Sequence, residues 1–188
     1  MVASAATLIR RHGASGTSID RVLALSGAPR GSVYHHFPGG RSQLVEEAVR
    51  YAGGYVADLI DQAATTGDPV AVVETFLALW REQLVASDYR AGCPVVAVAI
   101  ESHDDAPQLA RATREVFARW QGQLAAVLTG RGLSATRAHQ LATFALAAVE
   151  GALVLSRAEH GTHPLDDVGT ELRGVLRAAL PAGPEEAR

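Results

Sequence analysis

Helical periodicity of the apolar residues dominates the 188-residue chain, in segments that start or stop at Gly, Pro or Ser. No stretch shows the sustained alternation of apolar and polar residues, bounded by hairpin turns, that a half-buried sheet requires. Proline is well tolerated at the first position of a helix, and glycine is favoured just after the last. The sequence therefore predicts an all-α protein of about nine helices.

Three short helices are expected in the first quarter of the chain. The first stops at Gly13, and the second is capped by Thr17 or Ser18 and stops at Gly27. The third begins at Pro29, where the missing N–H has no cost. A short helix, a turn with glycine and a second short helix form a helix-turn-helix, whose second helix enters the major groove of DNA.

Six further helices are expected after this head. One runs from about residue 41 towards residue 64. The last two, at about 134–160 and 165–180, are rich in Ala, Leu and Val. Five starts are expected for the helices after the fourth: Asp68-Pro69, Cys93-Pro94, Ala106-Pro107, Leu133-Ser134 and His163-Pro164.

Charge is distributed unevenly along the chain, and all 17 basic residues are arginine. Residues 1–50 hold six arginines against three acids, whereas the remainder holds eleven against seventeen, so a chain of net charge −3 carries a basic first quarter. A basic segment suits binding to the polyanion DNA, and a chance fluctuation of three charges explains it equally well.

The third helix carries side chains that are unusual for a core element. Arg30 offers a planar donor fork that fits guanine O6 and N7, and Gly31 leaves room for close approach. Val33 and Phe37, four residues apart, should face the core. The alternative is that the rings of this helix only cover a small core. We expect nine residues to approach DNA: Thr17, Ser18, Arg30, Gly31, Ser32, Tyr34, His35, His36 and Arg41.

Residues 27–37 follow the motif G-x-x-x-G-x-x-Y-x-H-F, and Arg41 supplies a basic residue at the start of the fourth helix. With these features, residues 1–50 closely resemble the DNA-binding head of the TetR/AcrR family of repressors. The segment A-P-R-G-S-V-Y-H-H-F-P, together with Gly92-Cys93-Pro94, is similar to the subgroup of lincomycin-resistance and flavonoid-responsive repressors.

The resemblance implies a two-fold dimer that leaves its operator when a small molecule binds in the C-terminal domain. We accordingly expect residues 1–45 to bind double-stranded operator DNA, and residues 46–188 to bind the effector and to form the homodimer. Members of the family carry additional basic residues before the first helix, whereas this chain begins within it. A missing arm predicts a lower affinity for DNA, and a mis-assigned start of the chain is the alternative explanation.

Aromatic residues of the second domain can line a cavity or simply fill a core. Glu150 interrupts the apolar run FALAAVEGALVL, where a buried acid needs a ligand or a partner. We expect a small apolar or aromatic effector to contact Phe76, Trp80, Cys93, Ile100, Phe117, Trp120, Phe144 and Glu150. Small residues in the same run allow close helix packing across a two-fold axis. The expected dimer contacts are Ala145, Ala148, Ala152, Leu155, Leu172 and Leu176.

Other classes of protein find little support in the sequence. No nucleophile elbow, P-loop, zinc-protease or dinucleotide motif occurs, so we expect neither an enzyme nor a cofactor. The seven histidines lack the spacing of zinc ligands, so no metal site is expected. One cysteine, no leader and no membrane-length apolar run predict a cytoplasmic protein outside the membrane. The alternative is a helical small-molecule-binding protein or enzyme with weak or lost DNA binding.

Overall fold

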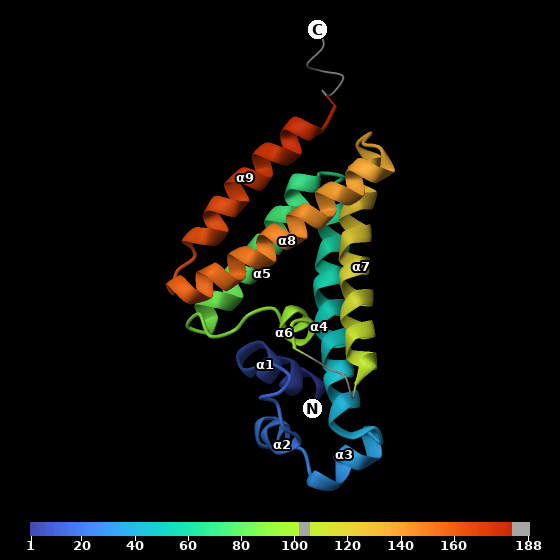
Figure 1. The fold of residues 1–188 in the computed structure, drawn as a ribbon, viewed down its shortest axis with the longest axis vertical. Helices are drawn as coiled ribbons and strands as arrows, with labels where there is room; N and C mark the ends of the chain where they lie inside the picture. Colours follow the sequence, from blue (N-terminus) through green and yellow to red (C-terminus); the bar gives the residue numbers. More distant parts are fainter. Residues whose placement is uncertain (102–105, 182–188) are drawn as a thin grey trace. The chain divides into compact units, whose positions relative to one another are not determined.

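The computed structural model describes residues 1–101 and 106–181 (Figure 1). Within these residues the chain is all-α, as the sequence predicts, and contains no strand. The nine described helices are α1 (Val2–His12), α2 (Ile19–Ser26), α3 (Arg30–His36), α4 (Gly40–Ala64), α5 (Pro69–Ala86), α6 (Pro94–Ala99), α7 (Pro107–Gly130), α8 (Ala135–Glu159) and α9 (His163–Ala179).

Packing divides the chain into two compact units. Unit 1 combines Met1–Tyr55 with Arg90–Ala118, and unit 2 combines Val56–Tyr89 with the chain from Arg119 onward. Helices α4 and α7 each continue from unit 1 into unit 2. Helix α6 and the first part of α7 therefore pack with the N-terminal helices, although they follow them by many residues in the sequence.

The start and stop signals of the head act at or within one residue of the expected positions. Ser18 caps α2 by accepting a hydrogen bond from the Arg21 N–H at 3.3 Å. Helix α2 ends at Gly27, whose φ of 68° lies in the left-handed region that glycine adopts at little cost. Pro29 is the N-cap of α3, so this helix begins one residue later than predicted. The core of this region includes the fully buried side chains of Ile9 on α1, Val22 on α2, Val33 on α3 and Leu44 on α4.

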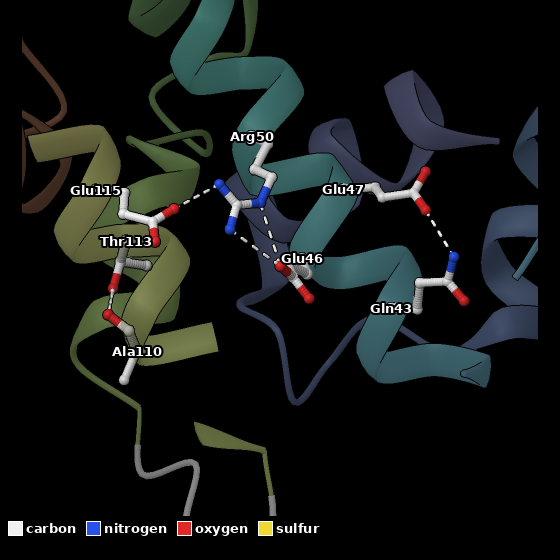
Figure 2. Close-up of polar contacts among 7 residues, drawn as sticks. All are labelled: Gln43, Glu46, Glu47, Arg50, Ala110, Thr113 and Glu115. Carbon is white, nitrogen blue, oxygen red and sulfur yellow. Dashed lines mark hydrogen bonds and ion pairs between the residues drawn. The ribbon is translucent and has the colours of Figure 1, made fainter. Parts of the chain in front are cut away.

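In unit 1, α7 is joined to α4 by an ion pair and by a close approach of the two helices. Arg50 Nη1 lies 2.7 Å from Glu115 Oε2, and its other nitrogens reach Glu46 one turn earlier in α4 (Figure 2). The hydrogen bond to Glu115 raises the pKa of Arg50. Gly53 faces Val116, and a Cβ atom on Gly53 would lie 2.5 Å from Val116 Cγ1. Glycine at this position therefore lets the helices touch.

Unit 2 is built on α5, α8 and α9 together with the later parts of α4 and α7. Helix α9 lies along α8 (Figure 1), and its Leu165, Leu172 and Leu176 are buried. Helix α9 approaches α5 closely at Gly169, where a Cβ atom would lie 2.9 Å from Leu77 Cδ1. The core of this unit thus lies between the apolar faces of these helices.

Helix α8 is long and apolar enough to cross a membrane, and it is the single such helix among the described residues. The expectation of no membrane-length apolar run concerned uninterrupted runs, and Arg137 and Glu150 interrupt this helix. In unit 2, 44% of the most apolar window of α8 is buried inside the protein. A helix with one face packed in the core of a protein has this composition as well.

Gly53→Ala is expected to lower the melting temperature, whereas Gly54→Ala is expected to raise it. Alanine improves helix propensity at both positions by about 1 kcal/mol. At Gly53 the new methyl group overlaps the buried, branched Val116, and overpacking of this kind costs about 1–3 kcal/mol. No atom lies within 4 Å of a Cβ atom on Gly54. Thermal denaturation followed by circular dichroism measures both variants, and equal shifts would contradict the close contact with Val116.

Candidate functional site

Two buried apolar side chains anchor α3, and most of its polar side chains are exposed. Val33 is fully buried and Phe37, directly after the helix, is 4% exposed, as the sequence predicts. Tyr34 is 67% exposed. The polar side chains on the exposed sides of the helix are those of Arg30, Tyr34, His35 and His36.

The first turn of α3 leaves Arg30 accessible. Its Nη2 atom lies 2.8 Å from Asp20 Oδ1 on α2, and both side chains are exposed. An exposed pair of this kind is weak, so the guanidinium can exchange Asp20 for another acceptor. No atom lies within 4 Å of a Cβ atom on Gly31, and the Ser32 hydroxyl donates to the Pro29 carbonyl at 2.6 Å. A guanine edge or a phosphate can therefore approach Arg30 over bare backbone.

Thr17, Ser18 and Arg41 contribute mainly to the internal structure of the head. Thr17 is 1% exposed, and its hydroxyl donates to the Gly13 carbonyl at 2.8 Å. Ser18 caps α2 and is exposed. Arg41 Nε donates to the Thr17 carbonyl at 2.8 Å, and Arg41 Nη2 donates to the Ala14 carbonyl. Two nitrogens of Arg41 are thus already engaged inside unit 1.

Unit 2 contains a cavity among α4, α5, α7 and α8 that is lined by apolar side chains. The volume open to the centre of a water molecule is about 30 Å³, which is room for roughly two water molecules. A cavity that holds benzene measures about 150 Å³. A ligand with a ring therefore fits only if lining side chains move.

Two of the eight residues expected to contact a ligand line this cavity. They are Phe76 and Trp120, whose ring centroids lie 5.8 Å apart. The ring of Trp80 meets Phe76 edge-on at 5.8 Å but lies outside the lining. Phe144 is 50% exposed, and the half-buried Glu150 shares its helix, α8, with lining residues without being one.

The other three residues expected at the ligand belong to unit 1, whereas the cavity belongs to unit 2. Cys93 is buried directly before α6, and Phe117 is half-buried on α7. Ile100, directly after α6, is 78% exposed. The residues that the sequence predicted for one ligand site are thus divided between the two units, and only two of them line the cavity.

Most of the residues expected at a dimer interface are buried inside the chain. Ala145, Ala152, Leu172 and Leu176 are each at most 2% exposed, and Ala145 lines the cavity. Ala148 is half-buried, and Leu155 is 53% exposed. Helix α8 instead presents an apolar stripe, which consists of Phe144, Ala147, Ala148, Gly151, Val154, Leu155 and Ala158.

Two family models match the chain. Residues 2–48 match the model of bacterial regulatory proteins of the tetR family, and residues 69–171 match the C-terminal domain of LmrA/YxaF-like transcriptional regulators. The chain belongs to the TetR family. The match confirms the family and the subgroup that residues 27–37 and Gly92-Cys93-Pro94 predict.

Curated HTH-type transcriptional regulators align with nearly the whole chain. An uncharacterized HTH-type transcriptional regulator of Mycobacterium tuberculosis is 46% identical over 96% of this chain and 94% of its own length. The HTH-type transcriptional regulator LmrA of Bacillus subtilis is 32% identical over 94% of this chain and 95% of its own length. The chain is therefore a TetR-family transcriptional regulator.

Solved structures share the fold. A TetR transcriptional regulator from Chloroflexus aurantiacus is 28% identical, with a TM-score of 0.75 over 97% of this chain and 94% of that one. A TetR regulator from Legionella pneumophila is 17% identical, with a TM-score of 0.81 over 93% and 94% of the two chains. TetR-family regulators bind operator DNA and act as dimers. Helices α2 and α3 lie within the matched N-terminal region and form the helix-turn-helix of this regulator.

Sequence reasoning missed most of the cavity wall. Eight aliphatic side chains line it beside the two aromatic ones: Ile60, Val72, Val73, Leu124, Ala142, Ala145, Leu146 and Val149. In the sequence these are ordinary apolar positions of a helix, and nothing in the pattern separates a residue that faces a gap from one in a filled core. Among the described residues, no group of three or more His, Cys, Asp or Glu side chains is placed to hold a metal ion.

Proposed function

We propose that this TetR-family regulator is a cytoplasmic repressor that occupies its operator as a homodimer and leaves it when an apolar small molecule binds in unit 2. Arg30 carries the DNA-binding part of the proposal. It stands exposed in the first turn of the second helix of a helix-turn-helix, beside the open backbone of Gly31. That turn enters the major groove, where a guanidinium recognises guanine.

The apolar stripe of α8 supports pairing of two copies through this helix. An apolar strip of this length on a monomer would face water, which is unfavourable. Ala147, Gly151 and Ala158 are small enough for two helices to approach closely across a two-fold axis. A symmetric pair matches the two half-sites of an operator, which lie about 34–36 Å apart.

The cavity of unit 2 supports an apolar effector with at least one ring. Its lining offers aromatic faces at Phe76 and Trp120 and no charged group. Such a ligand can release DNA only if it binds better to a form of the protein that fits the operator poorly. Helices α4 and α7 connect the ligand-binding unit to the DNA-binding unit without a break in the helix, and they carry this coupling.

Arg30→Ala should weaken binding to the operator by about 1–3 kcal/mol and relax the preference at one base pair in each half-site. Arg131→Ala, which removes an exposed arginine of unit 2, is the matched control and should bind as the wild type does. Fluorescence anisotropy with the DNA that flanks the gene, and with unrelated duplex DNA, measures both properties. Failure of the wild type to prefer its flanking DNA would favour a helical binding protein without a DNA-binding role.

Leu155→Glu should convert the homodimer to monomers, because it places two charges in the apolar stripe across the two-fold axis. His139→Glu introduces a charge at an exposed position of α8 outside the stripe and should leave the dimer intact. Analytical ultracentrifugation gives the masses, and circular dichroism checks that both variants remain helical. A dimer that survives Leu155→Glu would place the interface elsewhere.

Planar compounds with two or three aromatic rings should quench Trp120 more than Trp80 and release the operator at the same concentrations. The chain has two tryptophans, so Trp80→Phe leaves Trp120 as the sole reporter, and Trp120→Phe leaves Trp80. Trp120 lines the cavity, whereas Trp80 does not. Operator affinity should fall about five- to 150-fold at saturation. Release of DNA by a compound that leaves the Trp120 signal unchanged would place the effector site outside this cavity.

A further inference from the structure

The turn between α1 and α2 is held by a carboxylate that comes from far along the chain. Glu101, two residues beyond the end of α6, accepts hydrogen bonds from the backbone N–H groups of Ala14 at 2.7 Å and Ser15 at 2.8 Å. The Ser15 hydroxyl donates to the same carboxylate at 2.5 Å. One side chain therefore fixes two successive residues directly before the helix-turn-helix.

A side chain of opposite charge holds the same turn from α4. Arg41 donates to the carbonyl oxygen of Thr17 at 2.8 Å and to that of Ala14. Both backbone polar groups of Ala14 are thus bound by charged side chains, the N–H by Glu101 and the C=O by Arg41. Ala14 and Thr17 are each 1% exposed, so water can replace these bonds only if the turn opens.

The backbone at Gly13 is fitted to this carboxylate. Its φ of 72° and ψ of 174° fall in a region essentially restricted to glycine, and a Cβ atom would lie 2.3 Å from Glu101 Oε1. The segment before α6 is docked on α1 as well, because the Gly92 N–H donates to the Arg10 carbonyl at 2.9 Å. Residues 92–101 are therefore built into the DNA-binding unit at both of their ends.

We propose that Glu101 is a positioning residue for DNA binding, which sets the direction in which α2, and with it α3, leaves the turn. In this role Glu101 acts through the turn that it holds, by way of the Ala14 and Ser15 amides and the Ser15 hydroxyl. The proposal rests on the DNA-binding role of α3. It also assigns Arg41 to the internal support of the head, because the guanidinium expected at a phosphate already serves two carbonyl groups.

Charge and position predict opposite effects of removing this carboxylate. A negative charge in the DNA-binding unit repels phosphate, so its loss tightens DNA binding if charge alone matters. Loss of positioning weakens binding, because the freed turn must then be ordered when DNA binds. The dependence of the affinity on salt should keep its slope, since that slope counts phosphate contacts and Glu101 makes none.

The test compares Glu101→Ala and Glu101→Gln with the wild type, and Glu82→Ala, which removes an exposed acid of α5, is the control. Anisotropy with the operator duplex at several salt concentrations gives the affinity, and hydrogen exchange reports on the Ala14 and Ser15 amides. Glu101→Ala should weaken DNA binding about tenfold, the effect of losing roughly one hydrogen bond to a charged group. Glu101→Gln should weaken it less, because its amide oxygen still accepts, and both variants should exchange faster at the two amides.

Unchanged or tighter DNA binding in the Glu101 variants would overturn the positioning role, and so would unchanged exchange at Ala14 and Ser15. If Glu101→Ala fails to fold, the DNA affinity and the amide exchange of Glu101→Gln decide the question in the same way. Wild-type protein that binds no duplex would overturn the proposed function together with the positioning role. That result is recognised before any variant is measured, so the two failures are distinguishable.

Discussion

The length of α3 is the constraint on which the rest of the DNA-binding unit depends. A helix of seven residues is not stable in water by itself, because nucleation costs more than so few hydrogen bonds return. Its geometry must come from what it packs against, and Val33 and Phe37 are the side chains that the core holds. The supporting helices must therefore be fixed firmly, and the turn before α2 is fixed at both backbone groups of Ala14.

The supports of α3 come from distant parts of the chain. Arg90–Ala118 returns to pack with Met1–Tyr55, bringing the carboxylate of Glu101 and the ion-pair partner of Arg50. A change in this returning segment reaches the helix-turn-helix within one compact body. The structure thus explains how a motif of about 20 residues can be both exposed for recognition and rigid enough to recognise.

Local signals made the fold and the exposed face of α3 predictable from the sequence. Caps, glycine stops and helical spacing act between near neighbours, which is why the helix order and the burial of Val33 and Phe37 could be derived. The role of Glu101 could not be derived from the sequence, because its partners lie 86 and 87 residues away and no spacing rule links them. The same holds for the cavity, where eight ordinary aliphatic residues complete the wall beside Phe76 and Trp120. For the dimer, helical spacing alone did not show which side of α8 the core already covers.

The small volume of the cavity in unit 2 bears on how such a sensor responds. For an effector that binds there, the competent form is an opened one, so the apparent affinity is the intrinsic affinity reduced to the fraction of molecules that are open. Looser packing of α5 against α8 raises that fraction without adding any contact to the ligand. The concentration at which the regulator responds is then set by the stability of its core, and a more stable variant is a less sensitive one.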